Sequence, residues 1–456
     1  MPDGARTLGE SRQITRPLAD YAMGLAHERL PANVVEVAKH CFLDWIGVTI
    51  AGSAEPLSRM LVDQVRADGG AAQASVIGVG GLRANVGQTA LVNGTASHAL
   101  DFDDVQQRFH GHPTAPVAPV VLALAEERGA SGRDVIAAFV AGVEAECRIN
   151  VFMGDGHYER GWHSTATNGA FGAAVGAAHM LGFDGERCAL AMGIAGTQAA
   201  GLRAMFGTMC KPLHAGKAAQ NGLFGAQLAA RGFTSRPDIL ERPLGFGATQ
   251  SDGTDAAAAL AGLGERFEIE DVLFKYHAAC HGVHATIEAA RAIQARAHVD
   301  LAEIERVDVA VQSEYLNICG IDTPETGLEG KFSLRFCAAL ALAGADTADV
   351  ATYSDANVRD PALTALLEKV RIHAQPSMPM KVAEVAVLTR SGGAMEERFD
   401  VGVPERDLPR QWDKLAAKFR SCAEPVIGTA KTARVIDAVA GLDRAGDLSA
   451  LAAAWA

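Results

Sequence analysis

The stretch His98-Ala-Leu-Asp-Phe-Asp-Asp104, followed closely by His110-Gly-His112-Pro113, is the feature around which this chain is organised. It places three carboxylates and three imidazoles within fifteen residues of a sequence otherwise rich in Ala, Gly, Leu and Val. Ionisable groups are costly to bury unless they are paired or used in chemistry. The stretch therefore predicts a functional site within an apolar scaffold.

The composition indicates a folded protein of more than one domain. With 456 residues the chain exceeds one ordinary domain, so two domains are expected. Hydrophobic residues make up 49% and charged residues 21%, which is typical of a globular protein with a large core. The net charge of −13 argues against a nucleic-acid partner, although local basic groups can still bind an acidic ligand.

The sequence also predicts a cytoplasmic protein. Eight cysteines are scattered through mostly apolar runs without a CxxC pair, which favours reduced, buried thiols. Residues 1–7 carry an acid and lack an apolar stretch, so no secretory signal is expected. No run approaches the roughly 20 apolar residues that a membrane span requires.

Residues 1–269 are predicted to form the first part of a helical domain. Apolar residues recur at three-to-four spacing in residues 31–51, where Pro31 suits a first helical turn. A second apolar helix is expected over residues 115–127. Ser131-Gly-Arg-Asp134 resembles a capping box that opens a helix running to about residue 148.

The pattern changes near residue 270. Residues 307–313 and 382–399 alternate apolar with polar side chains, and Ser391-Gly-Gly393 predicts a hairpin turn within the second segment. Helical segments lie among these strands, so residues 270–402 are predicted to form a small α+β domain. Helical patterns return in residues 403–456, which we expect to dock on the first helical part. The smaller domain would then be an insertion, and a cleft between two domains is a favoured place for a ligand.

Four clusters of ionisable residues are candidates for the site, and the first is the opening stretch. If it is helical, Asp101 and Asp104 share one face and His98 lies one turn before Asp101. The alternative is a helix end with solvated acids and a paired histidine.

The second cluster is Gly161-Trp-His163-Ser164-Thr165, which precedes a helix expected over residues 170–180. Ser or Thr can cap such a helix, and a capped helix N-terminus attracts anions. The alternative is that His163 only packs beside Trp162.

The third cluster spans residues 201–217 and holds Arg203, Lys211, His214 and Lys217 among Gly and Pro residues. We predict a loop before a helix over residues 218–230. Loops held by rigid helices commonly carry function, and Arg with Lys suits a carboxylate ligand. A solvated basic loop is the alternative.

The fourth cluster, residues 275–284, contains His277, His281 and His284 at helical positions i, i+4 and i+7. Three histidines on one face could bind zinc, as in a metal-dependent hydrolase. The lack of an HExxH motif and the presence of Gly282 favour the start of a helix instead. We therefore predict no metal site.

Together the clusters offer carboxylate, imidazole and ammonium groups without a nucleotide-binding loop or a GxSxG motif. This combination suits proton abstraction next to a carboxylate, in which cations hold the acid groups of the substrate and His or Asp moves the proton. A non-catalytic helical binding protein is the remaining alternative.

Several motifs, in order and over nearly the whole chain, resemble those of the MmgE/PrpD family. They are residues 98–104 with His112-Pro113, residues 207–216, residues 275–284 and Lys331-Phe-Ser333. The resemblance implies a mainly α fold, with a large all-helical domain built from both chain ends and a smaller inserted α+β lid. It also implies a homodimer and no cofactor.

The resemblance further implies the residues of the site, in a pocket between the two domains. The catalytic positions fall on Asp101, His112, His163, Lys211, His281 and Tyr315. To these we add Arg203, His214 and His284 as substrate-binding residues.

The activities of the family include 2-methylcitrate dehydration, cis-aconitate decarboxylation and iminodisuccinate epimerisation. Val105 stands where the decarboxylases have Thr, so a hydroxyl donor is missing, and the loop of residues 106–111 is one residue longer. Arg203 stands where they have Met, and His281 and His284 are three rather than four residues apart. We therefore predict a lyase for a small di- or tricarboxylic acid, most like a 2-methylcitrate dehydratase. An iminodisuccinate-type epimerase and a cis-aconitate decarboxylase-like carboxy-lyase are the alternatives.

Overall fold

The computed structural model describes residues 13–455 and is mainly helical, which confirms the predicted fold class. The expectation that residues 1–7 hold no secretory signal lies outside the described residues. Contacts divide the chain into two compact units. Unit 1 runs to Val272 and resumes at Asp407, and unit 2 is Leu273–Arg406.

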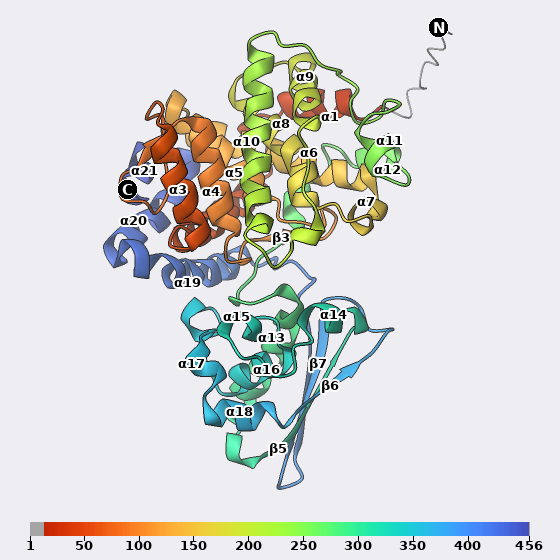
Figure 1. The fold of residues 1–456 in the computed structure, drawn as a ribbon, viewed down its shortest axis with the longest axis vertical. Coiled ribbons are helices and arrows are strands. Elements are labelled where there is room, and N and C mark those ends of the chain that lie inside the picture. Colours follow the sequence, from red (N-terminus) through yellow and green to blue (C-terminus); the bar gives the residue numbers. More distant parts are fainter. Residues whose placement is uncertain (1–12, 456) are drawn as a thin grey trace. The chain divides into compact units, whose positions relative to one another are not determined.

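Unit 1 consists of helices with a few two-residue strands (Figure 1). Its helices are α1 (Thr15–Met23), α2 (Ala32–Gly52), α3 (Pro56–Asp68), α4 (Val86–His98), α5 (Thr114–Arg128), α6 (Gly132–Met153), α7 (Asp155–Glu159), α8 (Ser164–Met180), α9 (Gly185–Gly196), α10 (Cys210–Ala230), α11 (Phe246–Gln250), α12 (Ala256–Leu260), α19 (Leu408–Ile427), α20 (Thr429–Ala440) and α21 (Ser449–Trp455). Its strands are β1 (Ala74–Ser75), β2 (Arg83–Ala84) and β3 (Val105–Gln106), and β4 (Val272–Leu273) stands at the boundary.

Helix α8 forms the centre of unit 1 and is buried over almost its whole length. It packs against α5, α6, α9 and α10. Small residues make this close packing feasible: a Cβ added to Gly172 would lie 2.4 Å from the Glu146 carboxyl, and one added to Gly222 would lie 2.5 Å from the Ala173 Cβ. Glycine at such crossings lets helix backbones approach closely.

A second close crossing joins α4 to α10. A Cβ on Gly94 would lie 2.9 Å from the Gly216 Cα, and one on Gly216 would lie 2.2 Å from the Leu91 carbonyl oxygen. His98 is the last residue of α4, and Lys211 lies in the first turn of α10. The crossing therefore fixes the two elements that carry the ends of the candidate site.

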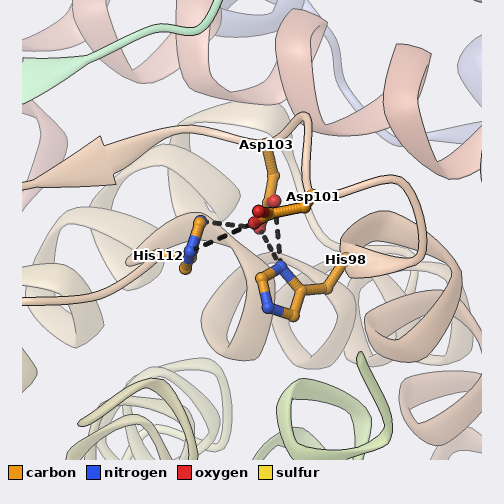
Figure 2. A group of neighbouring side chains, drawn as sticks. All are labelled: His98, Asp101, Asp103 and His112. Atoms are coloured by element: carbon orange, nitrogen blue, oxygen red, sulfur yellow. Dashed lines mark hydrogen bonds and ion pairs between the residues drawn. The ribbon is translucent and has the colours of Figure 1, made fainter. Parts of the chain in front are cut away.

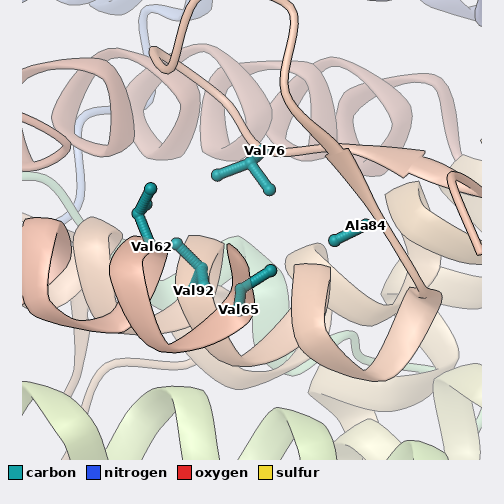
Figure 3. Packing of buried hydrophobic residues seen from close by; sticks show 5 residues of the cluster. All are labelled: Val62, Val65, Val76, Ala84 and Val92. Carbon is teal, nitrogen blue, oxygen red and sulfur yellow. The ribbon is translucent and has the colours of Figure 1, made fainter. Parts of the chain in front are cut away.

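A small apolar cluster supports the outer side of α4. Val62 and Val65 of α3, Val76 and Ala84 of the β1–β2 region, and Val92 of α4 are all buried together (Figure 3). The cluster holds α3 and the antiparallel β1–β2 pair against α4. Burying one such side chain contributes roughly 1.5–3 kcal/mol.

The boundaries of α2 and α6 confirm the predicted capping box and correct the place of Pro31. Ser131 and Asp134 form the predicted capping box at the start of α6, which runs on to Met153. Pro31, expected in the first turn, is instead the N-cap residue just before α2. Its fixed φ suits either place, since neither needs its missing N–H.

Unit 2 combines one sheet with helices on one of its faces (Figure 1). Its strands are β5 (Ile304–Val311), β6 (Val370–Ala374), β7 (Val382–Thr389) and β8 (Ala394–Asp400), in the order β6-β5-β7-β8. β5 pairs parallel with β6 and antiparallel with β7, which pairs antiparallel with β8 through the predicted Ser391-Gly-Gly393 turn. The helices are α13 (His281–Ala297), α14 (Leu316–Cys319), α15 (Gly327–Gly330), α16 (Leu334–Leu342), α17 (Asp355–Val358) and α18 (Pro361–Leu367). α13 and α16 pack against the sheet, where Val307, Val309 and Val311 of β5 are buried.

Two further predictions concern the cysteines and the membrane. None of the eight cysteines, all of which the structure describes, forms a disulfide, and six are buried as predicted, whereas Cys210 is exposed and Cys280 is partly exposed. Among the residues that the structure describes, no helix has the length and apolar character needed to cross a membrane.

The crossing of α4 and α10 gives a test of the packing. Gly216→Ala should lower the free energy of unfolding by about 1–3 kcal/mol, because its Cβ would collide with the backbone of Leu91 and with Thr95. Alanine would otherwise stabilise a helix interior by about 1 kcal/mol. The control is Gly446→Ala, since a Cβ there meets nothing within 4 Å. Denaturant unfolding in which Gly216→Ala matches or exceeds the wild-type stability would contradict the close approach.

Candidate active site

The acidic stretch forms a loop rather than a helix. α4 ends at His98, and Asp101 adopts a left-handed backbone conformation with φ of 51°. The expectation that Asp101 and Asp104 share a helical face is therefore wrong. The turn points the carboxylates of residues 101, 103 and 104 to different partners, so each has its own environment.

Asp103 is completely buried and lies between two imidazoles (Figure 2). His98 Nδ1 is 2.9 Å from both of its carboxylate oxygens, and His112 Nδ1 is 3.3 Å from one of them. Burial alone would raise the pKa of Asp103, but His112 and His98 overcome this effect and hold it well below its usual range. The carboxylate therefore stays ionised inside the protein.

Asp101 contacts both His112 and a lysine. Lys211 donates from Nζ to Asp101 Oδ1 at 2.8 Å, and His112 Nε2 lies 3.7 Å from the same oxygen. The side chains of Asp101 and Lys211 keep 30% and 16% exposure, whereas Asp103 keeps 1%. An ammonium and an imidazole thus converge on one carboxylate at the more accessible side of the cluster.

His163 extends the row of imidazoles. Its Nδ1 lies 3.1 Å from His214 Nδ1, its ring is 6.0 Å from the His98 ring, and Phe206 packs edge-on against it at 5.0 Å. Burial lowers the pKa of His163 well below its usual range, and the neighbouring His98, Lys211, His112 and His214 lower it further. His163 is therefore neutral, and one nitrogen of the His163–His214 contact donates while the other accepts.

The local structures around these residues differ from two predictions. His163 is the N-cap residue of α8, without a side-chain cap, so the helix begins earlier than residue 170 and neither Ser164 nor Thr165 caps it. Lys211 and His214 lie in α10 and not in a loop. Pro212 did not end the helix because it stands in the first turn, where its missing N–H is not needed.

The carboxyl group of Asp104 is hydrogen-bonded to Thr114. It accepts hydrogen bonds from Thr114 Oγ1 at 2.5 Å and from the Thr114 N–H at 3.4 Å, and its own backbone carbonyl accepts from His112 Nδ1 at 2.8 Å. Burial, with the charges of Asp44 and Asp103, raises the pKa of Asp104 to about 8, against the hydrogen bonds from Thr114. The side chain is therefore mostly protonated at neutral pH.

A buried lysine of the C-terminal helix α19 binds the backbone of the acidic loop. Lys418 of α19 donates to the Phe102 carbonyl at 2.7 Å, lies 3.9 Å from the centre of the Phe102 ring and pairs with Asp44 of α2 at 2.5 Å. Both charged side chains are at most 3% exposed. The pair fixes the backbone between Asp101 and Asp103.

Arg203 does not meet the carboxylates of the cluster. Its guanidinium donates to the Tyr158 carbonyl at 2.9 Å and stacks at 3.9 Å on the Tyr158 ring. Its role as a clamp for a substrate carboxylate stays a prediction, since it would require the guanidinium to share or leave these contacts.

His281, His284 and Tyr315 lie in unit 2. α13 begins at His281, in agreement with the predicted helix start, so His277 precedes the helix and the alternative face of three histidines does not form. His284 is buried and donates from Nε2 to the Ala279 carbonyl at 3.1 Å, while its ring lies 5.1 Å from that of His281. The Tyr315 hydroxyl accepts from the Lys381 N–H at 3.1 Å. These contacts of the three side chains all lie within unit 2.

One group has the composition of a metal site. Suitable atoms of His98, Asp101, Asp103 and His112 lie within 4.8 Å of one another (Figure 2). The Lys211 ammonium already neutralises Asp101, and the Asp103 carboxylate already faces two imidazole nitrogens. A metal ion would have to displace the Lys211 ammonium and the hydrogens that the two imidazoles direct at Asp103, so the donor set fits a metal poorly.

The chain that carries this site has relatives among known protein families. A family model described as the MmgE/PrpD N-terminal domain matches residues 16–259, and the MmgE/PrpD C-terminal domain matches residues 277–444. The chain belongs to the MmgE/PrpD family. The resemblance in the sequence motifs is thereby confirmed.

Similar proteins over nearly the whole chain include cis-aconitate decarboxylases. The chain is 29% identical over 471 residues to the cis-aconitate decarboxylase of Aspergillus terreus, an alignment that covers 96% of this chain and 95% of that protein. It is 27% identical over 457 residues to the Homo sapiens cis-aconitate decarboxylase, covering 96% and 94%. The MmgE/PrpD chain described here is an enzyme of the lyase class.

Sequence reasoning missed four residues of this MmgE/PrpD chain. His98 and Asp103 stand in the opening motif but received no role, and nothing in the sequence separates Asp103 from its acidic neighbours. Lys418 carried a signal, because it falls on the apolar face that Leu415, Phe419 and Cys422 share. No sequence signal points to Lys381 of unit 2, which has a backbone φ of 69°. Burial, together with the charge of Lys275, lowers the pKa of Lys381 to about 8, although Asp400 raises it.

The raised pKa of Asp104 predicts a dependence of stability on pH. Between about pH 4 and pH 8 the folded protein holds a proton on Asp104 that the unfolded chain releases. By linkage this group makes stability fall as pH rises through that window, by up to about 1.4 kcal/mol per pH unit. Asp104→Asn should remove this component, so the variant should gain stability relative to wild type from pH 5 to pH 8.

Guanidinium unfolding of both proteins at the two pH values measures the difference. The exposed Asp63→Asn serves as the control and should leave the difference between pH 5 and pH 8 unchanged. An Asp104→Asn variant that loses stability relative to wild type as pH rises would show that Asp104 is ionised in the folded state.

Because the possible metal ligands in the cluster already have other partners, we expect the fold of this protein not to depend on a bound metal. The purified protein should contain substoichiometric metal, and dialysis against a chelator should leave its melting temperature unchanged. Stoichiometric zinc or iron, or a melting temperature that falls on chelation, would contradict this interpretation. Zinc lost selectively in His277→Ala would instead support the metal site considered for unit 2.

Proposed function

We propose that this protein is a cofactor-independent carboxy-lyase acting on a small unsaturated tricarboxylic acid, of the cis-aconitate decarboxylase type. One observation carries the proposal: Lys211 Nζ and His112 Nε2 converge on the same carboxylate oxygen of Asp101, at 2.8 Å and 3.7 Å. This place accommodates a carboxylate beside both a cation and a group that exchanges protons. A substrate with adjacent carboxylates requires that combination.

The relatives favour decarboxylation over the dehydration that the sequence predicted. Val105 in place of Thr and Arg203 in place of Met had argued for a 2-methylcitrate dehydratase-like hydro-lyase. The relatives over the full length are cis-aconitate decarboxylases, which supports the carboxy-lyase alternative instead. Arg203 is held by Tyr158, so its presence does not weigh against decarboxylation.

The proposed reaction uses the cluster as follows. Lys211 holds a substrate carboxylate in competition with Asp101, close to His112 Nε2. Loss of carbon dioxide breaks a carbon–carbon bond and leaves its electron pair on the substrate, where it shifts through the double bond to another carbon. His112, protonated at Nε2, gives its proton to that carbon and recovers one from solvent. In the neutral His163–His214 pair, the ring that accepts at Nδ1 carries its hydrogen on Nε2 and donates it to one of the remaining carboxylates.

Several finer expectations stay predictions. Dehydration or epimerisation would use the same groups, with His112 or Asp101 removing a proton instead of returning one. The roles of His281, His284 and Tyr315, a homodimer and a cytoplasmic location belong to the same set.

Proton NMR in deuterated water identifies the reaction. The enzyme, without added metal, is incubated separately with cis-aconitate, 2-methylcitrate, citrate and iminodisuccinate. We expect new vinyl signals and release of carbon dioxide from cis-aconitate, with deuterium at the carbon that gains the proton. Loss of water from 2-methylcitrate, or exchange with inversion in iminodisuccinate, would establish one of the alternatives and reject the carboxy-lyase.

Two variants test the residues. His112→Gln should lower kcat by about 10²–10⁴-fold, since it removes the proton-exchanging nitrogen. Lys211→Ala should mainly raise KM, because it removes the cation for the substrate carboxylate. Lys217→Ala on the same helix, whose exposed ammonium contacts Gln220, is the control and should behave as wild type. Near-wild-type turnover by His112→Gln or Lys211→Ala removes that residue from the scheme.

A further inference from the structure

The buried pair His98–Asp103 has no role in the scheme above, although it is the most completely buried ionisable contact of the cluster. Both side chains are at most 1% exposed, and His98 Nδ1 is 2.9 Å from each carboxylate oxygen. Burying a carboxylate costs several kcal/mol unless it is paired and hydrogen-bonded. A pair of this kind is therefore expected to serve either the fold or the chemistry.

The contacts fix the position of the proton on His98. Nδ1 faces only carboxylate oxygens, which accept hydrogen bonds, so Nδ1 carries a hydrogen and donates it to Asp103. Nε2 is buried and has no hydrogen-bond partner. Burial lowers the pKa of His98 to about 4, more than the Asp103 charge raises it, so the ring is neutral and Nε2 holds a lone pair.

The same carboxylate acts on His112. Both neighbours of His112 Nδ1 are acceptors: the Asp104 carbonyl at 2.8 Å and an Asp103 oxygen at 3.3 Å. Nδ1 therefore keeps its hydrogen, and all exchange of protons with a substrate occurs at Nε2. A second proton on Nε2 produces an imidazolium whose positive charge lies against the Asp103 carboxylate. The arrangement corresponds to the Asp–His portion of a catalytic triad, in which the buried carboxylate orients the ring and stabilises the imidazolium.

His98 completes this arrangement from the other side. Its ring centre is 4.4 Å from that of His112, and its Nδ1–H holds both oxygens of Asp103 (Figure 2). Without this donor the carboxylate would be free to rotate away from His112, or would become protonated in its buried environment. His98 thus keeps Asp103 ionised and oriented.

We propose that Asp103 and His98 are positioning residues for His112: together with the Asp104 carbonyl, Asp103 keeps the hydrogen on His112 Nδ1, its charge stabilises the imidazolium, and His98 holds Asp103 in place without touching the substrate. The catalytic part of this inference rests on the proposed function, because it assigns proton transfer to His112. The protonation of His98 does not depend on any substrate.

Two replacements of His98 separate positioning from direct catalysis. The amide nitrogen of Asn can replace Nδ1 and donate to Asp103, whereas the amide of Gln reaches the place of Nε2. His98→Asn should retain turnover within about tenfold of wild type, and His98→Gln should lose at least 100-fold in kcat with little change in KM. Loss of activity in both variants, or better activity in His98→Gln, would show that Nε2 itself reacts and would overturn the positioning role.

Asp103→Asn tests the positioning role through the pH profile of activity, which a purely structural role of Asp103 would leave unchanged. We expect kcat to fall by about 10²–10⁴-fold, as when the carboxylate of an Asp–His pair is replaced elsewhere. The pH profile of the remaining activity should shift to lower pH by at least one unit, because the imidazolium has lost its counter-charge. The control is His179→Asn, a partly buried histidine of unit 1 bonded to the Leu25 carbonyl, which should change stability but not the profile. An unshifted profile in Asp103→Asn would overturn the proposal.

Nitrogen-15 NMR of histidine-labelled protein keeps the inference separate from the proposed function. The His98 signal, identified by its absence in His98→Asn, should show a protonated Nδ1 and an unprotonated Nε2 from pH 8 down to pH 5. If the wild-type enzyme converts none of the four acids, the proposed function fails while this measurement still decides the state of His98. A charged ring, or a proton on Nε2, would overturn the inference whatever the substrate.

Discussion

The burial of one ionised carboxylate governs the structure around the site. Asp103 is fully buried, and its charge is tolerated only because two imidazole nitrogens face it. The same constraint applies to the other acids of the loop, and each is compensated differently. Asp101 pairs with the Lys211 ammonium, Asp103 faces two imidazoles, and Asp104 is protonated. A helix would place Asp101 and Asp104 on one face, whereas the left-handed turn at Asp101 lets the two carboxylates take different partners.

The helical scaffold makes this possible through small residues. α4 and α10 cross at Gly94 and Gly216, where no Cβ fits, and α8 packs on its neighbours through Gly172 and Gly222. Backbones in such contact tolerate little sliding, because protein interiors are closely packed and their helices have few alternative registers. The Ala- and Gly-rich composition, which looks unspecific in the sequence, therefore sets the distances between the catalytic side chains.

The sequence was informative where local chemistry decides structure. The capping box at Ser131, the turn at Ser391-Gly-Gly393 and the helical class of the fold were all predicted, because each depends on short-range pattern. The spacing of residues 98–104 would place Asp101 and Asp104 on one face if the stretch were helical, but the contacts with His112, Thr114 and Lys211, which this spacing does not reveal, accompany a loop. Lys418 was missed for the same reason, because its importance depends on Phe102 and Asp44 rather than on its neighbours.

Lys418 is synthesised long after the acidic loop that it contacts. It is 316 residues from Phe102, whose carbonyl it holds. At a synthesis rate of roughly 5–20 residues per second, the interval between the two is on the order of 15–60 s. During that time Asp44 and the acidic loop lack their buried cation. The last helices thus act as a completion step, and a chain that ends before α19 lacks the cation that holds the reactive loop.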